Sequence, residues 1–201
     1  EDETTTLRAL EVADKYNIRT IVHGGDFIEG CANRQYGKSS QTILNELDKA
    51  LSQIPDNITI KLLLGNHDFS AFNNCSSLHE RLFHEPKLDI LGLNKVLLYW
   101  NNVIKIYLHH KVSWLKTEAE ENELKGDIKI LGHYHNFRLD EESKSIYLPS
   151  LCKDDTQISL EQFGYTFNTD IEPIFLVATI KDINAILFEA FSKDCLSTGK
   201  L

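Results

Sequence analysis

The sequence contains no methionine and no long hydrophobic run, and its few cysteines are far apart. The four cysteines, Cys31, Cys75, Cys152 and Cys195, form no CxxC pair, so they indicate neither a zinc knuckle nor a disulfide framework. Reduced thiols in a cytoplasmic protein are the simplest interpretation. No apolar run approaches the roughly 18 residues of a membrane span, and no basic region followed by an apolar stretch opens the chain. We therefore expect a soluble protein.

Basic residues are also scarce. The sequence has 21 Lys and Arg and 30 Asp and Glu, which gives a formal net charge of -9. A negative surface disfavours unspecific binding to long nucleic acid, and the basic stripe of a nuclease for long DNA is missing. A small phosphorylated substrate, such as a nucleotide or a short nucleic acid, remains compatible with this charge. Acidic composition also suits a site that holds cations.

The length of 201 residues, with 42% hydrophobic and 25% charged residues, predicts one globular domain that spans residues 1–201. Because methionine is absent, the sequence has no initiator. We expect either a fragment or processed product of a longer polypeptide, or a chain whose modified methionines are missing from the sequence. No pattern indicates an oligomeric state.

Apolar residues alternate between helical and strand spacing along the first two thirds of the chain. We expect helices over residues 4–16, 41–54 and 114–125, a partly helical segment over 69–86, and strands over 18–22, 58–64, 87–91, 95–100, 103–108 and 128–131. Segments 137–139, 144–148, 165–168, 174–180 and 184–190 are typical of antiparallel strands. This order predicts one α/β domain with mixed sheets.

Four of the expected strands end at a polar motif. The motifs are Gly24-Gly25-Asp26, Gly65-Asn66-His67-Asp68, His109-His110 and Gly132-His133-Tyr134-His135. In α/β sheets, ligands bind beyond the carboxyl ends of the strands, where side chains from several strands converge. A single His-x-His pair would be weak evidence, because alternate residues of a strand share a face. The conjunction of four such motifs predicts a functional site.

The side chains of these motifs are carboxylates, amides and imidazoles. These groups are typical ligands of divalent manganese, iron, zinc and nickel, whereas calcium or a structural zinc site is disfavoured. Two such ions that share a carboxylate clamp a phosphate and activate a water. We expect two divalent metal ions, manganese first, with iron, zinc or nickel as alternatives.

The order and spacing of the motifs resemble motifs two to five of the calcineurin-like metallophosphatase superfamily, over residues 18–135. The resemblance implies an α/β sandwich of two mixed sheets flanked by helices. It also implies that Asp26 bridges the two metals and that His135 binds the first metal. Asn66, His109 and His133 are implied as ligands of the second metal.

The resemblance further implies that His67 acts on the leaving group or the transition state. Asp68 can orient the imidazole of His67, so that it supplies a proton or a hydrogen bond to the departing oxygen. Adjacent strand residues point to opposite sides, so only one of His109 and His110 should reach the metals. We favour His109 as the ligand and expect His110 to contact the substrate or a ligand. Arg34, in the polar loop after the first motif, is a candidate for phosphate binding, with a solvated loop as the alternative.

The first motif of the superfamily, an Asp-x-His after an N-terminal strand, is absent, so the first strand of the fold is missing. Asp26 and His135 alone are too few to fill the first metal site. We expect a strand that carries this motif to precede Glu1 in the parent polypeptide. A relative that holds one metal or none, and a partner subunit that supplies the strand, are the alternatives.

These features predict metal-dependent hydrolysis of a phosphomonoester or a phosphodiester by a dinuclear centre with metal-activated water. The prediction requires that the missing motif is supplied upstream or by a partner. The alternative is a catalytically silent scaffold of the same fold that binds proteins, although a scaffold has no need of His67. The motifs do not identify the substrate, since selectivity is a property of the loops.

Overall fold

The computed structural model describes residues 3–28, 39–100, 102, 104–110, 128–133, 138–140, 145–148, 173–182, 185–192 and 196–197. The expected helix over 114–125 and the expected strand over 165–168 lie outside these residues. So do two of the candidate site residues, Arg34 and His135.

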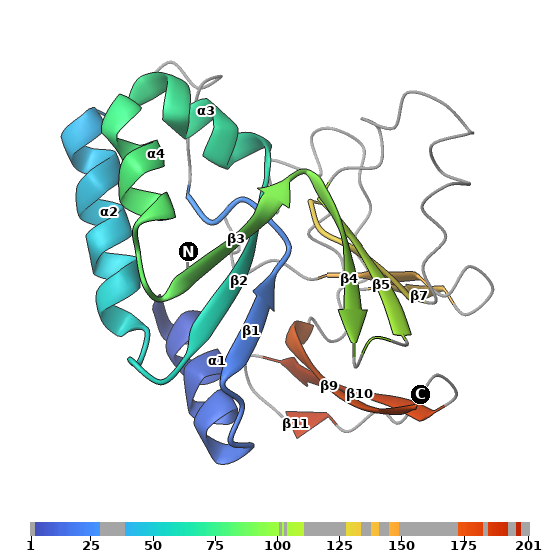
Figure 1. Ribbon diagram of the computed structural model, residues 1–201. Helices are drawn as coiled ribbons and strands as arrows, with labels where there is room; N and C mark the ends of the chain where they lie inside the picture. The colour runs from blue at the N-terminus through green and yellow to red at the C-terminus, as the bar shows by residue number, and fades with distance from the viewer. Residues whose placement is uncertain are drawn as a thin grey trace, which may run out of the picture.

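The first half of the chain forms a parallel sheet with helices packed against it (Figure 1). Its elements are α1 (Glu3–Lys15), β1 (Thr20–His23), α2 (Ser40–Gln53), β2 (Thr59–Leu64), α3 (Asn66–Asn74), α4 (Ser76–Phe83) and β3 (Leu88–Leu93). Strand β2 pairs in parallel with β1 on one side and with β3 on the other. All three strands therefore direct their carboxyl ends to the same edge of the sheet.

The main core lies between one face of this sheet and the helices. Strand β2 contributes Ile60 and Leu62, and α2 contributes Ile43 and Leu47, all of which are buried. The spacing of four residues in α2 puts both of its side chains on one helical face. Helix α2 begins directly after Ser39, whose hydroxyl accepts a hydrogen bond from the backbone N–H of Thr42 and so caps the helix. Burial of these side chains fixes β2 in the centre of the sheet.

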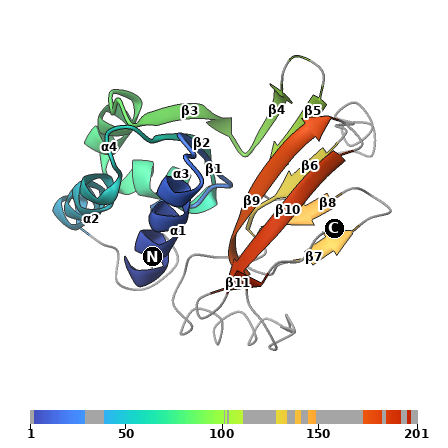
Figure 2. The same cartoon turned by 90° about the horizontal axis from the view of Figure 1, so that it is seen from below.

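The second half of the chain forms two further sheets, which Figure 2 shows on the side opposite the helices. The five-stranded sheet has the order β4-β5-β6-β8-β7 and contains β4 (Lys95–Trp100), β5 (Ile104–His109), β6 (Ile128–Leu131), β7 (Arg138–Asp140) and β8 (Ser145–Tyr147). Strands β5, β6 and β8 are parallel, and both edge strands are antiparallel to their neighbours. An antiparallel sheet of β9 (Pro173–Asp182), β10 (Ala185–Ser192) and β11 (Leu196–Ser197) completes the described elements.

Most described elements lie within a few residues of the segments that the sequence predicts, but the short strand β11 was not predicted, and two further details differ. Helix α3 begins at Asn66, where only a polar turn was expected, because Asp68 accepts a hydrogen bond from the backbone N–H of Gly65 and caps the helix. Strand β8 is parallel to β6, whereas the late strands were expected to be antiparallel. Among the described helices, none is both long and apolar enough to cross a membrane.

Candidate metal centre

The polar motifs after β1, β2, β5 and β6 converge where the first sheet meets the five-stranded sheet. Two residues of this region, Asp26 (φ 57°) and His133 (φ 67°), have left-handed backbone conformations. Such conformations are uncommon outside glycine and cluster at functional sites. Gly25, directly before Asp26, has a φ of 107°. The backbone is thus turned sharply at two of the places where a candidate ligand follows a strand.

His110 lies at the centre of this arrangement, with its side chain almost fully buried. Its Nδ1 lies 2.8 Å from the carbonyl oxygen of Gly24. Because a carbonyl oxygen only accepts, Nδ1 carries the proton and donates it to Gly24. The other ring nitrogen, Nε2, lies 3.1 Å from Oδ2 of Asp26 and 3.1 Å from Oδ1 of Asn66. Three atoms with lone pairs thus face one another, and such a group requires a proton or a metal ion between them.

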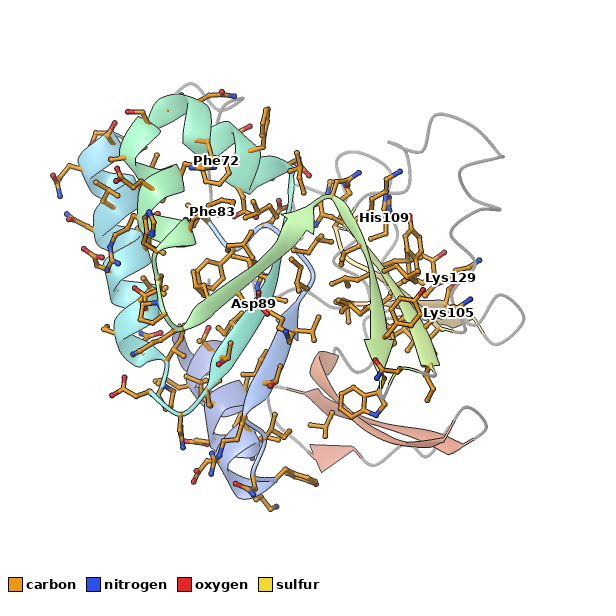
Figure 3. The ribbon with its side chains drawn as sticks, in the orientation of Figure 1. Phe72, Phe83, Asp89, Lys105, His109 and Lys129 are labelled. Carbon is orange, nitrogen blue, oxygen red and sulfur yellow. The ribbon has the colours of Figure 1, made fainter. Side chains whose placement is uncertain are left out.

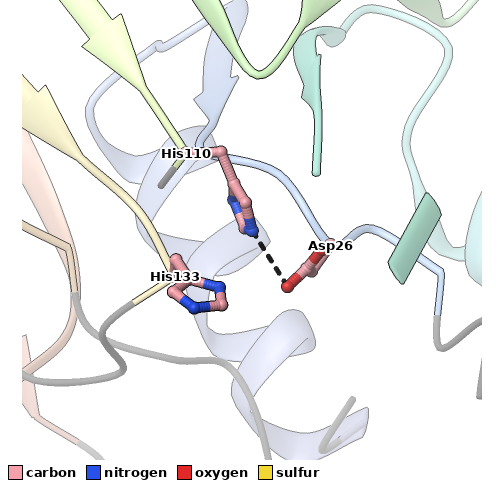
Figure 4. Close-up of side chains that lie close together, drawn as sticks. All are labelled: Asp26, His110 and His133. Atoms are coloured by element: carbon pink, nitrogen blue, oxygen red, sulfur yellow. Dashed lines mark ion pairs between the residues drawn. The ribbon is translucent and has the colours of Figure 1, made fainter. Parts of the chain in front are cut away.

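His133 completes a cluster with Asp26 and His110, in which one ligand atom from each residue lies within 4.8 Å of the others. Figure 4 shows the three side chains facing one another, with the rings of His110 and His133 edge to face at 5.0 Å. Together with the amide oxygen of Asn66, they offer two oxygens and two nitrogens. This donor set fits a divalent transition metal.

His109 points away from this cluster, so the structure does not bring it to Asp26. Figure 3 shows it at the end of β5, and its side chain is fully buried. Its ring stacks on Tyr107 at 5.7 Å, and its Nε2 lies 3.5 Å from Nδ2 of Asn94. Burial, and to a smaller extent the charges of Lys95 and His110, lower the pKa of His109 to about 4. The two adjacent histidines do point to opposite sides, but His110 occupies the place that we expected for His109.

Glycines make room for the buried imidazole of His110. A Cβ atom at Gly65 would lie 2.6 Å from the backbone nitrogen of Asp26 and 2.8 Å from Cε1 of His110. At Gly25 a Cβ atom would lie 2.9 Å from Cγ of His110. All three distances are too short for real atoms, so a side chain at either position would displace the ring.

The charge of Asp26 follows from its neighbours. Burial would raise the pKa of this carboxyl, but the hydrogen bond and charge of His110, with the charge and backbone N–H of His67, lower it to about 2. The N–H of His67 donates to Oδ1 at 2.8 Å. Asp26 is therefore ionised, with one oxygen toward His110 and the other tied to the first turn of α3.

Asp68 is a buried residue that connects the first polar motif to the second. It is fully buried, and its two oxygens accept hydrogen bonds of 2.8 Å from the backbone N–H groups of Ile28 and Gly65. Burial raises the pKa of Asp68 to about 6, although these amides oppose the increase. Asp68 thus ties the loop of Asp26 to the start of α3, and its orienting effect on His67 stays a prediction. The roles of His135 and Arg34 also stay predictions, since both lie outside the described residues.

A sequence model of the calcineurin-like phosphoesterase family matches residues 3–171. The chain belongs to this family. The calcineurin-like phosphoesterases use divalent metals, so the family agrees with the donor set around His110. Family membership also confirms the resemblance inferred from the motifs and the mixed α/β fold with two sheets flanked by helices.

One of the solved structures that match the chain is that of an archaeal phosphodiesterase. It is 17% identical to this calcineurin-like chain, and the alignment covers 94% of both chains with a TM-score of 0.48. No curated protein matches the chain.

Proposed function

We propose that this chain hydrolyses a phosphomonoester or a phosphodiester with the help of a divalent metal held by Asp26, Asn66, His110 and His133. The observation that supports the proposal is the approach of two oxygens to the same ring nitrogen, Nε2 of His110, at 3.1 Å each. The carbonyl oxygen of Gly24 holds the His110 ring in the tautomer that a metal ligand needs.

A second metal is proposed beside the first, with Asp26 as the shared ligand and His135 as a further ligand. Its remaining ligands would come from an Asp-x-His motif upstream or on a partner. Manganese is the first candidate, because two imidazoles, a carboxylate and an amide form a mixed set of intermediate softness. Iron, zinc and nickel fit the same donors.

The metal would supply a stabilising positive charge for the phosphate and a lowered pKa for the attacking water. Asn66 is a neutral ligand, so it leaves more of that positive charge available than a carboxylate would. Asp26 is held in its ionised form by His110 and His67. These residues therefore bind and orient, and none of them has to move a proton.

His67 is the proposed residue for proton donation to the leaving group. It lies in the first turn of α3, is partly exposed, and its backbone N–H is bonded to Asp26. The start of α3 thus holds the backbone of His67 against Asp26, the proposed bridging ligand, which supports a role of its imidazole at the leaving group. Asp68, the following residue, is proposed to fix its orientation.

The experiment uses protein in which the missing Asp-x-His motif is supplied, and it measures manganese content and nitrophenol release from nitrophenyl phosphate and from bis-nitrophenyl phosphate. We expect His67→Ala to lower turnover by about 10²-fold to about 10⁴-fold, the usual contribution of a general acid, while metal content stays near normal. His84→Ala is the matched control, since His84 is exposed at the end of α4. Unchanged turnover in His67→Ala would contradict the mechanism.

Metal analysis also separates the enzyme from the silent scaffold. About two equivalents of metal per chain, in protein in which the Asp-x-His motif is supplied, support the dinuclear enzyme, and no bound metal supports the scaffold. For this enzyme we continue to predict a small phosphorylated substrate and a cytoplasmic location. Among the described residues, Cys75 has a free and buried thiol, and the other three cysteines lie outside them.

A further inference from the structure

Asn94 is the single residue between β3 of the first sheet and β4 of the five-stranded sheet, at the corner visible in Figure 1. We propose that Asn94 is a positioning residue that fixes His110 relative to Asn66 and thereby sets the metal affinity of the site. This inference rests on the proposed function, because it takes these two side chains as metal ligands.

Two short backbone hydrogen bonds support the proposal. The N–H of Asn94 donates to the carbonyl oxygen of Leu64 at 2.8 Å, and Leu64 stands two residues before Asn66. The carbonyl oxygen of Asn94 accepts from the N–H of His110 at 2.7 Å. One residue is therefore bonded on one side to the segment that carries Asn66 and on the other side to His110 itself.

Both hydrogen bonds depend on the left-handed conformation of Asn94, whose φ is 65°. Asparagine tolerates this conformation, whereas a β-branched residue does not. The side chain adds a contact with the strand of His110, since its Nδ2 lies 3.5 Å from Nε2 of His109. The backbone hydrogen bonds of Asn94 thus hold the corner between β3 and β4, and the side chain of Asn94 supports it.

The position of the corner matters because the two ligands come from different sheets. Asn66 follows β2 of the first sheet, and His110 follows β5 of the second. Metal–ligand distances are defined within about 0.2 Å, so a small shift of one sheet against the other removes a ligand. Among the described residues, Asn94 provides a direct backbone connection between the two segments at this point.

The test compares Asn94→Val with Asn102→Val. Asn102 has nearly the same conformation, with a φ of 58°, but it lies exposed in the turn between β4 and β5. Valine should therefore strain the backbone similarly at both positions and lower the melting temperature of both variants. Manganese affinity is measured by calorimetry on metal-free protein, without substrate.

We expect Asn94→Val to weaken manganese binding by about tenfold to about a hundredfold, the usual effect of losing support behind a ligand. Asn102→Val should bind manganese with the affinity of the wild type. Asn94→Gly should also stay close to it, because glycine keeps the conformation and both backbone hydrogen bonds. Equal affinities of Asn94→Val and Asn102→Val would overturn the proposal and leave Asn94 as an ordinary turn residue.

If Asn94→Val does not fold, the pair Asn94→Ala and Asn102→Ala decides the question by the same comparison, since alanine strains the backbone less. Wild-type protein that binds manganese but releases no nitrophenol refutes the proposed function and leaves this inference intact. Wild-type protein that binds no manganese overturns the inference as well.

Discussion

Replacing His110 by alanine should abolish tight manganese binding, whereas the same replacement of His109 should leave it nearly unchanged. The two residues are adjacent and both are buried, but only Nε2 of His110 faces the oxygens of Asp26 and Asn66. Loss of a supporting residue behind a ligand already costs up to about a hundredfold in affinity. Loss of the ligand itself should cost at least that much, or about 3 kcal/mol.

The metal-free protein should show a second difference between the two variants. The pKa of Asp26 falls from its ordinary 3.8 to about 2, mainly because His110 outweighs the effect of burial. This difference corresponds to about 2 kcal/mol of stability that is present above pH 3.8 and is lost as the pH falls toward 2. Without His110, only His67 opposes the effect of burial on the carboxyl, so His110→Ala should lose a large part of this amount at pH 7.

The assay is urea unfolding with a chelator present, at pH 7 and near pH 2, together with calorimetric titration of manganese at pH 7. For His110→Ala, the loss of stability relative to wild type should be larger at pH 7 than near pH 2, by up to about 2 kcal/mol. For His109→Ala, which does not touch Asp26, no such Asp26-linked difference is expected. Retained metal binding in His110→Ala, with loss of binding in His109→Ala, would refute the assignment and restore the expectation from the sequence.

Two further predictions concern the support of the site. Burial raises the pKa of Asp68 from 3.8 to about 6, so its ionisation removes about 3 kcal/mol of stability as the pH rises through this range. The stability difference between wild type and Asp68→Asn in urea unfolding should therefore be larger at pH 4 than at pH 7, and a constant difference would contradict the burial argument. Gly65→Ala should weaken manganese binding in calorimetry by more than about tenfold, because its Cβ would meet the backbone of Asp26 and the ring of His110. The control Gly24→Ala should have a smaller effect, since its Cβ would meet the movable end of Leu148, and equal effects would argue against a steric cause.

Local patterns in the sequence were sufficient for most elements that frame the site. The strand over residues 128–131 has the predicted bounds, and α2 differs from its prediction by one residue at each end. Both carry strong periodic signals, and α2 also begins at a serine cap. The start of α3 was missed because Gly65 gives no side-chain cap, and the signal that marks it, Asp68 at the third helical position, was interpreted only as a partner of His67.

The sequence by itself determined the family and the groups available for chemistry, because the motifs are short, ordered and placed after apolar runs. It also determined that only one of two adjacent histidines could point toward the other motifs, since alternation along a strand is a local property. Only the tertiary structure decided which one. That choice depends on how the five-stranded sheet sits against the first sheet, and the hydrogen bonds of Asn94 to Leu64 and His110 are long-range contacts that no local pattern encodes.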